Sequence, residues 1–534
     1  MTRAETGGRY APGGRAASAG LVQQNRRLFE AVVRASRGQL RRHRWQSAVG
    51  WAQTAAAFAA QCHPGWLTSR ELEIVLEECG QVLVKEPRSE ERSDSSDPSR
   101  VLHVMSSVAT TGGHTRWVNS WIRADTQRKH SIVLVDQRAA VPSWLRQATA
   151  MTGGEVMTLP CATAPWERAD MLRTAARDAD LVVLATHQAD VIGPLAFGSN
   201  AAGVKRLRLN HADHMFWLGT SISDVVLDFR EVGQYHSIAH RGFDRARCFL
   251  SPLPVVAPDP IPRSAARQSL GLPHDAPVLL SAGGPYKFES SGGLGFLDVI
   301  EPLLAALPEL IVLVAGPSPV GRWATVAKRW QGRLRPLGVR PGIADCFRAA
   351  DIYLDSYPVG SDTALVEAAL ARCVVARYQP EGTIPLIQGD HDCFEGSLLT
   401  PENPEELIDD MSAVLGDAEA RHRLQVEAYD RAYAAHGPAS WAVRLPHIYA
   451  AVAGVTHADA TTLAPASATS ETTAEALACL EPYRPVRRLA FVALSQRRSV
   501  EPTSPIGVVL ARLMALGRRR PGYVDSPNRT PRQR

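Results

Sequence analysis

The chain has 534 residues, of which 45% are hydrophobic and 21% charged, and its formal net charge is +5. This length exceeds one ordinary hydrophobic core and predicts two domains with extensions. The composition excludes a disordered or fibrous protein. The charge is uneven: the segment from Glu481 to Arg534 carries twelve arginines against three acidic residues, a net +9, so the remainder carries about −4.

The basic tail admits two interpretations. It is a contact surface for anionic lipid, nucleic acid or an acidic partner, or it is a solvated arm. Of the contacts we expect a peripheral one with a membrane, and no nucleic acid.

The eight cysteines are scattered without a C-x-x-C pair, which argues against a disulfide framework and structural zinc. The first twenty residues lack the apolar core of a signal peptide. No apolar run reaches membrane-spanning length, because Pro308 and Glu309 interrupt one candidate and Arg512 interrupts another. We therefore expect a cytoplasmic, soluble protein, peripheral to the membrane if the tail binds lipid.

The N-terminal part of the chain reads as three segments. Residues 1–24 are Gly/Ala/Arg-rich and predicted to be disordered. Residues 25–84 carry apolar residues at helical spacing, with a third helix starting near Ser69. Residues 85–99 are charged and Ser-rich and predict a linker.

Strands then alternate with helical segments twice, on either side of a Pro-rich hinge between Pro252 and Pro262. This pattern predicts parallel sheets covered by helices on both faces, and so an α/β protein with two Rossmann-like domains. Ligands bind at the carboxyl ends of such strands, so both halves are expected to face one cleft. The predicted strands are 101–105, 132–135, 155–159, 180–185, 206–209 and 225–228 in residues 100–256, and 278–281, 310–315, 352–355 and 374–376 in residues 257–437.

Two segments follow the second half. Residues 438–455 are expected to form a helix, and residues 456–534 a linker and the basic tail. Within the tail, the segment from Ile506 to Arg520 is either an interfacial amphipathic helix or a terminal helix docked on the body.

The first candidate loop contains Gly112, Gly113 and His114, directly after a strand and before a helix. Paired glycines let a backbone approach a ligand, and free N–H groups at a helix start favour an anion. The loop matches neither the dinucleotide fingerprint nor a P-loop. It is a candidate phosphate or acceptor loop, or simply a glycine turn.

The second candidate surrounds Asp213 at the end of a strand. His211 or His214 is positioned to act as general base on an acceptor hydroxyl, or to steady a diphosphate. A metal site is a weaker alternative, because the spacing lacks the i, i+4 pattern of helical zinc pairs. His187 is a further candidate for the cleft wall.

Two loops of the second half suit a diphosphate. Gly283 and Gly284 precede Lys287. The glycine turn would supply N–H groups and Lys287 a positive charge; the alternative is a glycine turn with a solvated lysine. Further on, Ser361, Asp362 and Thr363 begin a helix. One of them suffices for capping, and three after a glycine indicate phosphate binding on the helix dipole.

At these places the sequence resembles GT-B glycosyltransferases, most strongly between Val278 and Arg377. The resemblance implies that the second domain holds a nucleotide-diphosphate sugar, most simply a UDP-sugar, as substrate, with no cofactor, and that the first domain holds an acceptor, which stays unidentified. Lys287 would contact the diphosphate and Ser361–Thr363 would cradle it. Glu367 looks like the acidic residue that binds the donor ribose.

The resemblance implies more than the donor site. The segment from Ser440 to Tyr449 looks like the helix that crosses back onto the first domain. Independently of the resemblance, the N-terminal helices are expected to form part of the acceptor pocket or a homodimer contact.

One departure from the family concerns Val359. The retaining branch usually carries a glutamate there, eight positions before Glu367, and the loop looks closer to the inverting O-GlcNAc transferase and protein N-glucosyltransferase pattern. Both stereochemical outcomes stay open: an inverting path would use His211 or His214 as base, and a retaining path the donor phosphate. No D-x-D motif lies in a suitable loop, so metal-independent catalysis is expected.

Two other functions use the same features. A sugar-nucleotide epimerase would use the cleft without a second substrate. A non-catalytic nucleotide-sugar-binding or scaffold protein would use the extension and tail as contact surfaces. Intact Lys287 and Glu367 count against the scaffold, and donor hydrolysis assays distinguish the three.

Overall fold

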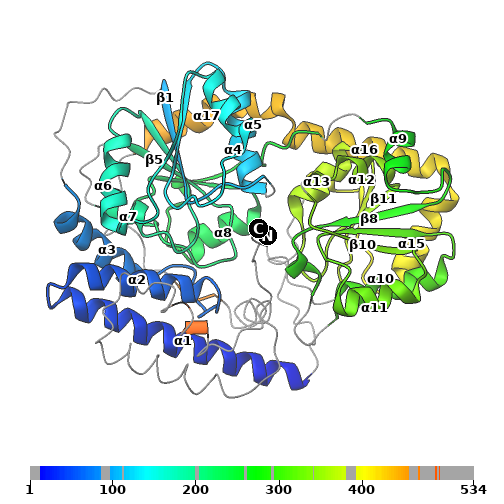
Figure 1. Cartoon of the computed structure of the whole chain (residues 1–534), viewed down its shortest axis with the longest axis horizontal. Coiled ribbons are helices and arrows are strands. Elements are labelled where there is room, and N and C mark those ends of the chain that lie inside the picture. The colour runs from blue at the N-terminus through cyan, green and yellow to red at the C-terminus, as the bar shows by residue number, and fades with distance from the viewer. Residues whose placement is uncertain are drawn as a thin grey trace, which may run out of the picture.

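The fold is described from a computed structural model of the chain (Figure 1). Gly112 and nearly all of the basic tail, including 506–520, lie outside the described residues. The structure describes residues 12–85, 97–110, 113–198, 204–257, 261–289, 294–340, 342–380, 392–455, 467–469, 488–489 and 492.

The N-terminal extension consists of three helices, α1 (Pro12–Leu40), α2 (Trp45–Ala59) and α3 (Arg70–Leu83). Helix α3 begins where the sequence predicts, since the side chain of Ser69 accepts a hydrogen bond from the Leu72 amide. Helix α1 begins at Pro12, within the residues 1–24 for which the sequence predicts disorder. Proline is well suited to a first helical position.

The first domain contains a seven-stranded sheet of order β3-β2-β1-β4-β5-β6-β7, and every pairing in it is parallel. The sequence analysis missed β7, an edge strand of only three residues, which is too short to show a periodic pattern. The strands are β1 (Arg100–Met105), β2 (Lys129–Leu134), β3 (Val156–Thr158), β4 (Leu181–Ala185), β5 (Lys205–Leu209), β6 (Val225–Asp228) and β7 (Cys248–Leu250). The helices are α4 (Gly113–Ala124), α5 (Ser143–Met151), α6 (Pro165–Ala175), α7 (Ile192–Phe197) and α8 (Glu231–Ala239), with a 3-10 turn η1 (Arg245–Arg247).

The second domain contains a parallel sheet of order β10-β9-β8-β11-β12-β13. Its two edge strands, β10 and β13, were not predicted as strands. The strands are β8 (Val278–Ala282), β9 (Ile311–Ala315), β10 (Leu334–Gly338), β11 (Ile352–Leu354), β12 (Val374–Ala376) and β13 (Leu398–Leu399). The helices are α9 (Arg263–Ser269), α10 (Phe296–Ala306), α11 (Gly321–Arg329), α12 (Ala344–Ala349), α13 (Asp362–Leu370), α15 (Pro404–Gly416) and α16 (Ala418–His436), with 3-10 turns η2 (Pro285–Phe288) and η3 (Asp392–Phe394).

Helix α17 (Pro438–Gly454) leaves the second domain and packs on the first, as expected from the sequence (Figure 1). It joins the core cluster that α4 and α5 form with one face of the first sheet. The indole of Trp121 donates to the Tyr449 hydroxyl at 2.9 Å, and that hydroxyl donates to Asp125 at 2.5 Å. Hydrogen bonding at a buried position fixes where the crossover helix docks.

The extension is continuous with the first domain. One core cluster contains side chains of α1, α2 and α3 together with α6, α7 and the other face of the first sheet. Leu489 from the C-terminal part of the chain belongs to the same cluster. Among the helices that the structure describes, none is both long enough and apolar enough to cross a membrane.

Candidate functional site

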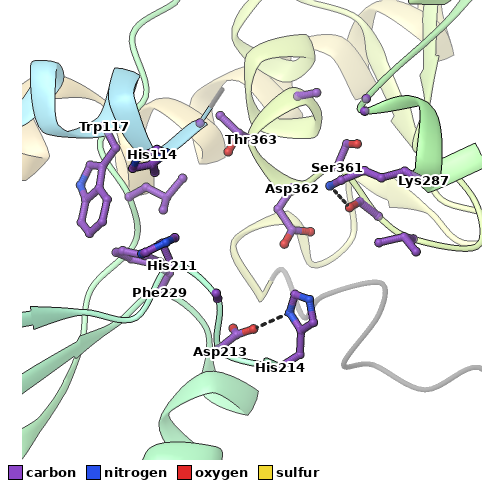
Figure 2. Close-up of a pocket in the computed structure, with 18 of the residues that line it drawn as sticks. His114, Trp117, His211, Asp213, His214, Phe229, Lys287, Ser361, Asp362 and Thr363 are labelled. Carbon is purple, nitrogen blue, oxygen red and sulfur yellow. Dashed lines mark hydrogen bonds and ion pairs between the residues drawn. The ribbon is translucent and has the colours of Figure 1, made fainter. Parts of the chain in front are cut away.

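A cleft of about 1020 Å³ lies between the two domains, at the carboxyl ends of both sheets. Its walls come from the loops after β1, β5 and β6, from the loops after β8 and β11, and from the end of α2. Of the site residues predicted from the sequence and described by the structure, all but His187 line it: Gly113, His114, His211, His214, Gly283, Gly284, Lys287, Ser361, Asp362, Thr363 and Glu367. Figure 2 shows side chains of both domains pointing toward the cleft.

Gly283 and Lys287 follow β8 on the second-domain wall. A Cβ atom at Gly283 would lie 2.4 Å from the Ser361 hydroxyl, so a larger residue here would require that hydroxyl to shift. The ammonium of Lys287 donates to the Gly360 carbonyl at 2.6 Å. This bond holds the charge beside the start of α13 with a neutral partner, which an anion would replace favourably.

The start of α13 faces the cleft without a side-chain cap. Ser361 occupies the N-cap position, yet its hydroxyl bonds that of Ser356 at 2.7 Å instead of an amide of the helix. The Ser361 amide donates to Asp355 at 2.8 Å, which fixes the loop. The alternative that Ser361 merely caps the helix is therefore not what the structure shows, and the positive end of the helix dipole is directed toward the cleft.

An ionic chain crosses the cleft from the first domain to the second. Arg230 binds Asp213 with two hydrogen bonds of 2.7 and 2.9 Å, and lies 3.6 Å from Asp362. Asp362 also lies 3.6 Å from Arg377, which pairs with Asp355 at 3.2 Å. The sequence analysis missed Arg230 because an arginine after a strand has no distinctive spacing.

Glu367, the expected ribose ligand, is already paired across the cleft. Its carboxylate lies 2.6 Å from the guanidinium of Arg116 in α4. Burial raises the pKa of Glu367 above its ordinary value, and Arg116 opposes that rise. The sequence analysis missed Arg116, although its place two residues after His114 in the glycine loop was a usable signal.

Three histidines gather on the first-domain wall. The rings of His114 and His211 stack at 5.4 Å, and His187 packs edge-on against His114 at 5.8 Å. Burial, followed by His187, lowers the pKa of His114 to about 4. Burial and then His114 hold the pKa of His211 well below its usual range. Both rings are therefore neutral near pH 7; His187 supports the cluster and, contrary to expectation, does not line the cleft.

His214 has a different environment. Its Nδ1 lies 3.1 Å from a carboxylate oxygen of Asp213, and about a third of its side chain is exposed (Figure 2). Burial alone would raise the pKa of Asp213, but Arg230 and His214 hold it far below the ordinary value. An ionised Asp213 therefore keeps the Nδ1 proton of His214 toward itself and leaves Nε2 as an acceptor.

The glycine loop of the first domain approaches the second. A Cβ atom at Gly113 would lie 3.0 Å from the Thr363 hydroxyl, so this loop and the start of α13 nearly touch.

Within the described part of the chain, no group of three or more His, Cys, Asp or Glu side chains is placed to hold a metal ion.

No protein-family model and no curated protein matches the sequence. Solved structures do. A glycosyltransferase from Rickettsia africae aligns with a TM-score of 0.53 and 13% identity, over 67% of this chain and 100% of its own. HepE from Anabaena, solved with UDP and glucose, aligns with a TM-score of 0.52 and 17% identity, over 66% of this chain and 99% of its own. The chain has the fold of the GT-B glycosyltransferases, with two Rossmann-like domains facing a cleft.

Proposed function

We propose that the protein transfers a sugar from a nucleotide-diphosphate sugar to an acceptor hydroxyl, with the donor in the second domain. The observation that carries this proposal is the convergence of Lys287, the uncapped start of α13 and Glu367 on one wall of the cleft. A lysine and a helix N-terminus suit a diphosphate, and a buried carboxylate suits the two hydroxyls of a ribose.

We propose UDP as the nucleotide of the donor. HepE, which shares the fold, was solved with UDP and with UDP-glucose. In this chain the nucleoside would lie between Glu367 and the loop after β9, where Gly316 has a φ of +134°. A Cβ atom there would lie 2.0 Å from the Gly283 carbonyl, which supports a role for this glycine in keeping the donor wall open.

Transfer forms a bond between the acceptor oxygen and the anomeric carbon, and breaks the bond from that carbon to the diphosphate. The electron pair leaves with UDP, whose charge Lys287 and the α13 dipole would stabilise. On an inverting path the acceptor proton goes to a base, for which we favour His214 over His211. Asp213 orients His214, whereas the ring of His211 is enclosed by the histidine cluster. On a retaining path the donor phosphate takes the proton.

Binding and turnover of several UDP- and GDP-sugars test the function. We expect calorimetry to detect UDP binding, and chromatography to detect slow release of UDP from a UDP-sugar with water as acceptor. A protein that binds no nucleotide and turns over no donor contradicts the proposal. Retention of the nucleotide on a changed sugar would instead identify an epimerase.

We further propose that catalysis is independent of a metal ion, since Lys287 and the helix dipole are placed to neutralise the leaving diphosphate. EDTA is expected to leave the rate of UDP release unchanged. A loss of activity that Mg²⁺ or Mn²⁺ restores would contradict this.

A further inference from the structure

We propose that the end of α2, with the loop that follows it, forms a wall of the acceptor site, and that this wall selects an uncharged acceptor rich in hydroxyl groups, such as a glycoside. The inference rests on the proposed glycosyl transfer, and it gives the N-terminal extension a place in the reaction. Four residues make up this wall, which we call the α2 wall: Ala59, Ala60, Gln61 and His63.

The α2 wall is fixed to the loop that carries His214. Phe29 of α1 packs edge-on against Phe216 at 5.5 Å, and the Trp217 amide donates to the Leu67 carbonyl at 3.1 Å. Ala59 and Phe216 belong to the same core cluster. The extension therefore cannot move away from the cleft without disrupting the first domain.

The α2 wall presents hydrogen-bond donors. The Gly65 amide donates to Nδ1 of His63 at 3.0 Å, so a neutral His63 carries its proton on Nε2. Burial, followed by His214, lowers the pKa of His63 to about 3, which keeps the ring neutral. Nε2 is buried and has no hydrogen-bond partner in the part of the chain that the structure describes. Such a buried donor costs free energy unless a ligand or water accepts from it.

Gln61 supplies a second donor. Arg488, from the C-terminal part of the chain, donates to the side-chain oxygen of Gln61. That bond orients the amide and leaves its NH₂ group to donate. Two neutral donors on one wall match the hydroxyl or ring oxygens of a sugar.

The charges around this wall disfavour an ionised acceptor. None of the four residues of the α2 wall is charged at neutral pH. On the first-domain side, Asp213 is neutralised by Arg230, and Arg116 by Glu367. Two cations beside the wall are engaged within the protein, Arg26 with the Pro64 carbonyl and Arg488 with Gln61. An acceptor carboxylate or phosphate would therefore lose its hydration and gain a partner only by breaking one of these bonds.

The same side of the cleft offers an apolar face. Trp117 and Phe229 line it and pack edge-on at 4.2 Å (Figure 2). Aromatic side chains suit the C–H face of a sugar ring or an aryl group. An aryl glucoside therefore combines the features that the α2 wall and this pair would recognise.

The test places a bulky side chain on the α2 wall and leaves the residues proposed to bind the donor unchanged. Ala60→Trp is compared with Ala57→Trp, which changes a partly buried alanine of the same helix that does not line the cleft. The probes are p-nitrophenyl β-glucoside and the anionic p-nitrophenyl β-glucuronide. Their binding is measured by saturation-transfer NMR with and without UDP, and UDP binding is measured separately by calorimetry.

We expect the wild-type protein to bind the glucoside and to bind the glucuronide about tenfold more weakly. Ala60→Trp should weaken glucoside binding about tenfold or more, while Ala57→Trp leaves it unchanged and both keep UDP binding. The milder Gln61→Ala should weaken glucoside binding severalfold, from loss of one hydrogen bond.

Each contrary result has its own meaning. Glucoside binding that survives in Ala60→Trp and Gln61→Ala overturns the placement of the acceptor. Equal binding of the glucuronide, or no binding of the glucoside by the wild-type protein, overturns the acceptor class. A wild-type protein that does not bind UDP overturns the proposed function instead. In that case, glucoside binding measured without UDP still tests the α2 wall.

Discussion

Arg116 and Glu367, 251 positions apart in the sequence, form an ion pair of 2.6 Å that joins the first domain to the second across the cleft. Arg116 lies in the first turns of α4, and Glu367 lies in α13. In this pair, Arg116 binds the carboxylate that we expect to bind the donor ribose. A bound donor would therefore share Glu367 with Arg116 or displace Arg116 from it. The distance between the two domains would then depend on whether the donor site is occupied.

The pair predicts a pH dependence of UDP binding. Burial raises the pKa of Glu367 and Arg116 opposes the rise, so Arg116→Ala should raise this pKa further. As the pH falls, Glu367 of the variant becomes protonated at a higher pH than in the wild-type protein. We expect the affinity of Arg116→Ala for UDP to weaken on acidification before that of the wild-type protein does, in calorimetric titrations from about pH 8 to about pH 5.

UDP itself titrates in this range, so the ratio of the two dissociation constants at each pH is the informative quantity. Arg116→Lys, which keeps the charge, should follow the wild-type curve closely. Parallel curves for Arg116→Ala and the wild-type protein would show that Glu367 does not bind the nucleotide through its ionised form.

Lys287 provides the second prediction. Replacing it with alanine removes one charged hydrogen bond to the diphosphate and should raise the dissociation constant of UDP about tenfold or more. Uridine, which has no phosphate, should bind both proteins equally weakly. Lys328→Ala serves as the control, because Lys328 is exposed on α11 away from the cleft. Unchanged UDP binding in Lys287→Ala would contradict the placement of the diphosphate.

The two candidate bases are separated by a third experiment, carried out on transfer to an identified acceptor. His214→Ala should lower kcat on the order of 10² to 10⁴-fold while UDP affinity stays close to wild type. Asp213→Asn should also lower kcat, because it removes the carboxylate that orients His214. His211→Ala should lower kcat much less. The reverse order would assign the base to His211, and equal small effects would favour the retaining path.

The sequence located the second-domain wall of the cleft better than the first-domain wall, for a physical reason. Lys287, the start of α13 and Glu367 belong to local patterns, in which a strand, a loop and a helix fix the geometry over a few residues. The contacts of Arg116 with Glu367 and of Arg230 with Asp362 form between domains, and no local spacing encodes them.

The edges of the fold were less predictable for a related reason. Strands β7 and β13 are only two or three residues long, so their apolar residues are too few to show the periodicity of a strand. The place of His63 in the cleft depends on how α2 packs against the first domain, a tertiary contact that helical periodicity does not reveal. Ser361 had the correct residue type for a cap, but Ser356 binds its hydroxyl instead.

Gly283 supports the last prediction, because its missing side chain makes room for Ser361. A Cβ atom at this position would lie 2.4 Å from the Ser361 hydroxyl, so Gly283→Ala should displace the start of α13 and weaken UDP binding about tenfold. Gly416→Ala, where a Cβ atom meets nothing within 4 Å, is the control and should bind UDP normally. Adding Ser361→Gly to Gly283→Ala removes the clashing hydroxyl and should restore much of the affinity, measured by calorimetry. A double variant as weak as Gly283→Ala alone, when Ser361→Gly alone binds UDP well, would show that the effect does not arise from this contact.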